Sequence, residues 1–130
     1  VMEAYTTADV LTTSTTYVDT GLACAITPTS KCNKIAVQVV GNMGKDGSDT
    51  NATKARLDRS GTTLAPIGPP YIGGSPTYAP CSALYLDSPY SVSSLTYSLL
   101  WAVQTGGAGR FNTDYGDGAT AVMILTELRA

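Results

Sequence analysis

Residues Ala119–Leu128 read ATAVMILTEL, and this stretch is apolar on both sides when it is drawn as a β-strand. Successive side chains of a strand point to opposite faces, so the even-numbered and odd-numbered residues form two separate apolar rows. A surface strand of an isolated antiparallel sandwich has one apolar row and one polar row. Two apolar rows indicate a place in the middle of a core or contact with another copy of the chain. The residues predicted to form an oligomer interface are Ala121, Val122, Met123, Ile124 and Leu125.

The rest of the chain is typical of short strands separated by clusters of Gly, Pro, Asn and Ser, without a convincing helix. Apolar and small or polar residues alternate in Leu95–Gln104, which predicts a central strand with Trp101 as its core anchor. The other predicted strands cover Ser14–Val18, Leu22–Ile26, Lys34–Gly41, Arg56–Arg59, Thr62–Leu64 and Cys81–Asp87.

The clearest turn signal is Ser60-Gly61, which lies between two of these predicted strands. A two-residue loop that ends in Gly can adopt the positive φ of a tight hairpin turn. The pairs predicted by this hairpin are Arg59 with Thr62 and Asp58 with Thr63.

The predicted fold class is all-β: an antiparallel β-sandwich of jelly-roll or Greek-key type with about seven to eight strands. At 130 residues the chain has the length of one domain with one core. We expect residues 14–130 to form the sandwich. Residues 1–13 are expected to be an N-terminal arm or a join to an upstream region.

Composition excludes several classes of function. Charged residues make up 14% of the chain, against about a quarter in an average protein. The formal net charge is -2 and no basic stripe is present, which argues against nucleic acid as a partner. The absence of histidine removes the usual general base and the Ser-His-Asp and Cys-His catalytic arrangements. No apolar stretch has membrane length, so membrane insertion is not expected.

The three cysteines, Cys24, Cys32 and Cys81, are too few and odd in number for a closed disulfide framework. Cys24 and Cys32 flank a turn, so a bridge between them is geometrically allowed. Free, half-buried thiols are the simpler expectation. Because no CxxC spacing occurs, a structural zinc site is not expected.

Two pairs of acids lie in Gly-rich loops: Asp46 with Asp49, and Asp114 with Asp117. Paired acids can hold calcium or hydrolyse a glycosidic bond. Neither loop has the full ligand pattern of a calcium loop, and Asp in such loops usually serves turn geometry. We therefore expect no metal, no cofactor and no enzymatic activity.

The chain has eight tyrosines, whose flat rings and polar tips suit interfaces and sugar rings. Tyr17, Tyr85 and Tyr97 fall in predicted strands, where packing inside the domain is the expected role. Others fall in Pro- and Gly-rich loops, where they either contact a ligand or fasten the loop to the body or to a neighbouring subunit. The residues predicted to contact a receptor or glycan are Tyr71, Tyr78, Tyr90, Arg110, Asn112, Asp114, Tyr115 and Asp117.

Four stretches, taken in order, resemble one family: STTYVDTGLACAITPTSKCNKIAVQV, RLDRSGTTL, LYLDSP with the strand that follows, and a last strand ending in LTEL. This order is similar to a domain of tail-fibre-like and other virion structural proteins of tailed bacteriophages, especially marine and cyanobacterial ones. The resemblance spans Ser14–Leu128. It implies a β-sandwich on the surface of a virion, commonly a trimeric tip or knob, and it transfers no catalytic motif.

The function expected from the sequence is a non-enzymatic virion protein: the distal, receptor-binding head of a trimeric tail fibre. Its partners would be itself as a homotrimer, other virion proteins, and a glycan or protein of the host cell surface. The loops Asn42–Asn51, Pro66–Pro80 and Thr105–Gly118 would make the host contacts. The alternative is a protein that decorates or cements a capsid or caps a tail without binding a receptor. An enzyme acting on surface polysaccharide would depend on the Asp pairs alone.

Overall fold

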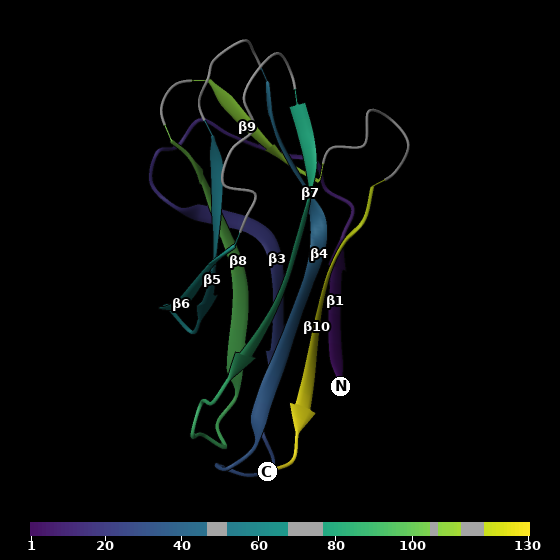
Figure 1. The fold of residues 1–130 in the computed structure, drawn as a ribbon, viewed down its shortest axis with the longest axis vertical. Helices are drawn as coiled ribbons and strands as arrows, with labels where there is room; N and C mark the ends of the chain where they lie inside the picture. Colours follow the sequence, from purple (N-terminus) through teal and green to yellow (C-terminus); the bar gives the residue numbers. More distant parts are fainter. Residues whose placement is uncertain (47–51, 68–76, 105–106, 113–118) are drawn as a thin grey trace.

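The computed structural model describes residues 1–46, 52–67, 77–104, 107–112 and 119–130, and these residues form strands and no helix (Figure 1). The strands are β1 (Met2–Thr6), β2 (Val10–Thr12), β3 (Val18–Ile26), β4 (Lys34–Asp46), β5 (Thr53–Arg59), β6 (Thr62–Ile67), β7 (Thr77–Asp87), β8 (Leu95–Val103), β9 (Ala108–Phe111) and β10 (Ala121–Leu128).

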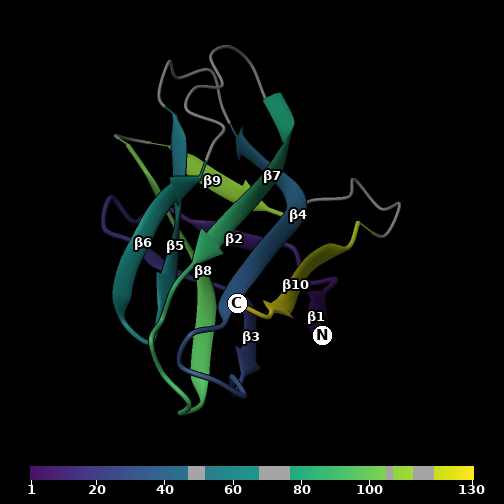
Figure 2. The same ribbon diagram turned by 60° about the horizontal axis from the view of Figure 1, so that its bottom comes forward.

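These strands form two antiparallel sheets that pack face to face, which confirms the predicted β-sandwich (Figures 1 and 2). The smaller sheet has the order β3-β8-β5-β6. In the larger sheet β7 pairs with one edge of β4. The other edge of β4 pairs first with β10 and, further along the strand, with β9. β1 lies outside β10, and β2 lies outside β9. Apart from the short β2 and β9, the larger sheet reads β1-β10-β4-β7, so the chain winds between the sheets as a jelly roll does.

The core lies between the sheets and is filled by one side of each main strand. β8 is a central strand of the smaller sheet, and Trp101 on it is fully buried, as predicted. The Trp101 ring packs against Phe111 of β9 with 6.2 Å between the ring centroids. Further core side chains are Leu22, Ile35, Val37, Val39, Leu57, Leu99, Met123 and Leu125.

The predicted hairpin between β5 and β6 is confirmed, including its register: Arg59 pairs with Thr62 and Asp58 with Thr63. Both turn residues have positive φ, 46° at Ser60 and 85° at Gly61. Positive φ at both positions is the geometry whose twist matches that of the flanking strands.

The first thirteen residues differ from the expected arm, because they contain β1 and β2. β1 pairs with β10, from Met2 opposite Leu125 to Thr6 opposite Ala121, and β2 pairs with β9. Both strands are short, five and three residues, so their own residues show too little alternation to predict a strand. Their place in the sheet depends on partners from the other end of the chain.

The strand expected at residues 14–18 is absent except for Val18, where β3 begins. The break expected after it is a bulge inside β3, where the register shifts between Asp19 and Ala23. Gly21 has φ 81° at this point, a conformation that a residue without Cβ adopts freely.

β4 and β7 continue into segments that the sequence predicts as loops. They pair from Ile35 opposite Asp87 up to Lys45 opposite Thr77. A side chain at Gly44 would overlap the ring of Tyr78 on the neighbouring strand, so the glycine leaves room for the aromatic ring to cross it. The glycines of this segment predict a loop, but in the structure Gly44 allows close packing within a sheet.

The two ends of the sandwich differ. Most of the residues that flank the undescribed segments lie toward the upper end in Figure 1, where β4 and β8 end and β5 and β7 begin. The two termini lie toward the lower end, beside the turn from β3 to β4.

Candidate interaction surfaces

The outer side of the larger sheet carries large apolar side chains that no other element covers in the described part of the chain. The strand registers align them in rows, with Tyr5, Val122 and Val40 in one row and Ile124, Gln38 and Leu84 in the next. The exposed fractions are 76% for Leu84, 75% for Tyr5, 51% for Leu86 and 48% for Val40. We define the outer apolar face as Tyr5, Ala36, Gln38, Val40, Leu84, Leu86, Val122 and Ile124.

A shallow depression of about 230 Å³ lies on this face between β4 and β7, lined in part by Gln38, Val40 and Leu84. Singly exposed apolar residues are ordinary, whereas a contiguous group on one sheet is a candidate interaction site.

The outer side of the smaller sheet is different in chemistry. Arg56 forms an ion pair with Asp58 at 2.9 Å, and the Tyr17 ring covers its guanidinium group at 4.4 Å. Lys54 lies 5.2 Å from the centre of the same ring. As far as the described residues go, none of the large apolar side chains left exposed belongs to this sheet. Among the described strands, large apolar side chains are therefore exposed on the larger sheet and not on the smaller one.

β10 contributes to both the core and the outer apolar face. Ala121, Met123 and Leu125 are fully buried in the core of their own chain, so they are not available to a second copy. Val122 and Ile124 point to the outer side and are half-buried. Of the predicted interface residues, these two alone lie on a surface that another copy can reach.

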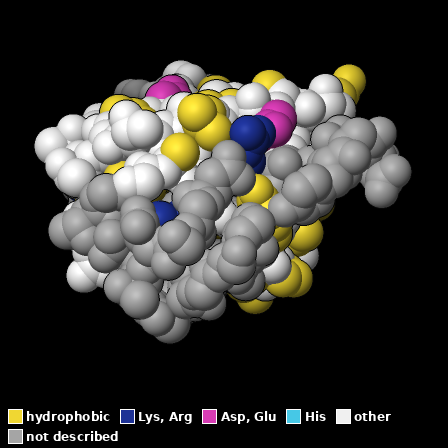
Figure 3. Space-filling model, turned by 90° about the horizontal axis from the view of Figure 1, so that it is seen from above, with side chains coloured by type: hydrophobic (Ala, Val, Ile, Leu, Met, Phe, Trp, Pro, Cys, Tyr) yellow, Lys and Arg dark blue, Asp and Glu magenta, His cyan; other side chains and the backbone are white. Residues whose placement is uncertain are grey.

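The predicted receptor site is only partly described, because Tyr71, Asp114, Tyr115 and Asp117 lie outside the described residues. Tyr78 is half-buried over Gly44 on β7, near the upper end. Arg110 on β9 forms an ion pair with Asp9 at 2.7 Å, and both side chains are about one-third exposed. Figure 3 views this end, and hydrophobic side chains are visible there in several places.

Two other predicted contact residues are not brought together with these. Tyr90 is 77% exposed but lies between β7 and β8, at the opposite end of the sandwich. Asn112 is 1% exposed. Its amide nitrogen donates hydrogen bonds to the carbonyls of Thr6, Ala8 and Ala119 at 3.0, 3.4 and 3.2 Å. Asn112, which has φ of 59° directly after β9, thus joins three backbone segments from inside.

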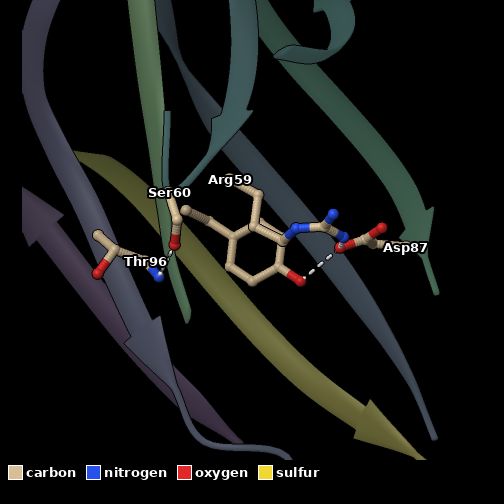
Figure 4. Close-up of polar contacts among 5 residues, drawn as sticks. Arg59, Ser60, Asp87 and Thr96 are labelled. Atoms are coloured by element: carbon tan, nitrogen blue, oxygen red, sulfur yellow. Dashed lines mark hydrogen bonds and ion pairs between the residues drawn. The ribbon is translucent and has the colours of Figure 1, made fainter. Parts of the chain in front are cut away.

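A buried polar contact that the sequence did not predict joins the two sheets. Asp87, at the end of β7, accepts hydrogen bonds from the Tyr97 hydroxyl at 2.7 Å and from Arg59 at 2.5 Å (Figure 4). Tyr97 is fully buried and Asp87 is 6% exposed. Burial, reinforced by the hydrogen bond to the Asp87 carboxylate, raises the pKa of Tyr97 well above its ordinary value. The contact fastens the sheets together.

A second polar cluster fixes the lower end. The Glu127 carboxylate accepts hydrogen bonds from Asn33 Nδ2 at 2.9 Å and from the Thr29 backbone N–H and hydroxyl at 2.6 and 3.0 Å. These bonds favour the ionised form, led by the one from Asn33, and lower the pKa of Glu127. Asn33 Oδ1 also accepts the N–H of Ala130 at 3.3 Å, so the cluster holds the end of β10 against the turn before β4.

The remaining candidate chemistry is limited. All three cysteines are free: Cys24 and Cys81 are buried and Cys32 is exposed. Burial raises the pKa of Cys24, and it raises the pKa of Cys81 to about 11. The described residues contain no group of three or more His, Cys, Asp or Glu side chains able to hold a metal ion. The Asp46 side chain and Asp49 are outside the description, as are the other two acids of the predicted pairs. No helix suited to crossing a membrane occurs in the described part of the chain.

Comparison with known proteins gives no match to a protein-family model and no match to a curated protein. The fold and its surfaces are therefore the basis for the assignment of function.

Proposed function

We propose that this chain is a virion structural protein, the distal head of a trimeric bacteriophage tail fibre, which contacts glycans or proteins on the host surface. The observation that carries the proposal is the strand order β1-β10-β4-β7 against β3-β8-β5-β6. Jelly rolls of this kind build viral capsid and lectin domains. The resemblance of Ser14–Leu128 to phage virion domains supports the same class.

The arrangement of the two ends fits a receptor-binding head. Most of the strand ends that flank the long connections lie toward one end of the sandwich, and the termini lie toward the other (Figure 1). A link to the rest of a particle through either terminus leaves the opposite end free for contact. Loops held on a rigid sandwich carry binding residues in many folds, and several weak sites on one trimer gain affinity through multivalency.

Localisation in intact particles tests this proposal. We expect immunogold labelling of particles that carry the chain to mark the fibre tips, and the purified chain to bind host cells or an immobilised host glycan. Labelling of the shell, without host binding, would assign the protein to capsid decoration. Absence of the chain from purified particles, measured by mass spectrometry, would reject both virion roles.

A further inference from the structure

The outer apolar face has charged side chains at its margins. Glu3 lies on the edge strand β1 and Lys34 at the foot of β4, and both are exposed. Between them, the outward positions on β10 and β4 carry apolar, small or uncharged polar side chains. A surface without like charges at its centre can meet an identical surface without Coulomb repulsion.

The polar groups in the middle of this face are also self-complementary. Gln38 is exposed at the centre, with Ile124 on one side and Leu84 on the other. A glutamine amide carries both donors and an acceptor, and the hydroxyl of Ser82 likewise donates and accepts. Because a buried amide without a partner is costly, an occupant must offer both kinds of group, and a second Gln38 does so.

The size of the face suits an interface between copies. β10 and β4 pair over the seven residues Val122–Leu128, and four strands cross the face. With about 4.8 Å between strands and about 3.4 Å per residue, the footprint is about 19 Å by about 24 Å. This footprint is about 460 Å² and its protruding side chains expose more than that, against about 800 Å² that each partner buries in a stable complex.

We propose that the outer apolar face packs against the same face of neighbouring copies of this chain. Val122, Ile124 and Val40 lie at the middle of the contact, and Gln38 meets Gln38 of its neighbours. The proposal rests on the assembly included in the proposed function and deepens it, because it assigns the surface. It also separates the two rows of β10: the odd-numbered row holds the single chain together, and the even-numbered row joins copies.

Charge complementation at Gln38 tests this surface. Gln38→Lys and Gln38→Glu each place like charges against one another in a self-contact, so each variant alone should dissociate to monomers, measured by size exclusion with light scattering. An equimolar mixture of the two variants should recover the wild-type mass, because a mixed trimer has two Lys–Glu contacts against one contact between like charges. Recovery also shows that both variants are folded. Thr96→Lys and Thr96→Glu, on the outer side of the smaller sheet, are the matched controls and should assemble as the wild type does.

Three results would overturn the proposal: a wild-type chain that stays monomeric at high concentration, Gln38 variants that assemble normally, or a mixture that stays monomeric. Normal assembly of the Gln38 variants would move the contact elsewhere and leave the virion role standing. Successful complementation in a protein that is absent from particles would support the surface and reject the virion role.

Discussion

The hydroxyl of Tyr97 on β8 donates a hydrogen bond of 2.7 Å to the carboxylate of Asp87 at the end of β7, and so connects the two sheets through the interior. A buried carboxylate is costly unless it is paired, and here Arg59 completes the pairing.

Tyr97→Phe should lower the free energy of unfolding by about 1–3 kcal/mol, because it removes one of the partners of a buried carboxylate. The difference from the wild type should shrink above about pH 10, the ordinary pKa of a phenol. Folding raises the pKa of Tyr97, so its stabilising effect is complete below that pH and is lost as the pH rises. Urea titrations between pH 7 and pH 11 measure both effects. Tyr90→Phe, at an exposed position, is the control, and a constant difference across this range would contradict the assignment.

Glu127→Gln tests the cluster at the lower end through acid titration. Folding lowers the pKa of Glu127, so its carboxylate stabilises the fold above its ordinary pKa of about 4.3 and loses this effect as the pH falls. We expect the wild type to be more stable than the variant at neutral pH and the two to converge toward about pH 3. Glu3→Gln, at an exposed position on β1, serves as the control. A wild-type advantage that persists in acid would show that charge is not the cause.

The three thiols should react in two groups. Cys32 is exposed, while Cys24 and Cys81 are buried and have raised pKa values that disfavour the reactive thiolate. Ellman's reagent at pH 8 should therefore modify one thiol rapidly in the native protein and the other two only after unfolding. Cys32→Ser should abolish the rapid phase. Rapid reaction of a second thiol would show that the sandwich opens readily.

Gly44→Ala should destabilise the protein by about 1–3 kcal/mol, because the new Cβ overlaps the Tyr78 ring and forces it to move. Tyr78→Ala removes the obstacle, so the double variant should lose less stability than the sum of the two single variants. Chemical denaturation of all four proteins gives the coupling energy. Strict additivity would mean that Tyr78 does not rest on the glycine.

Sequence reasoning succeeded where a local signal determines the structure. Gly61 after Ser60 determines the hairpin and its register, and the alternation around Trp101 determines a buried central strand. These features depend on neighbouring residues only. The two apolar rows of β10 were likewise visible, because side-chain alternation needs no knowledge of the partner strands.

The parts that sequence reasoning missed depend on distant partners. β1 is a strand because β10 pairs with it, and the chain near Met2 contains little to show this. The contact of Asp87 with Arg59 and Tyr97 is formed only when the sheets pack, so spacing along the chain could not reveal it. Asn112 is a residue type that is common in exposed loops, and only the folded structure shows that it is buried.

The pairing of β1 with β10 also constrains the order of events during synthesis. β1 is made before the other described strands, but its only hydrogen-bonded neighbour among them, β10, is made after all of them. Until that last strand is made, the edge of β4 that will receive it, including Val37 and Val39, is open in the nascent chain. Pairing between strands that are far apart in the sequence is slow, and unpaired strand edges that are prone to aggregation stay exposed in the meantime. The greatest danger of misassociation therefore falls in the interval before β10 is made.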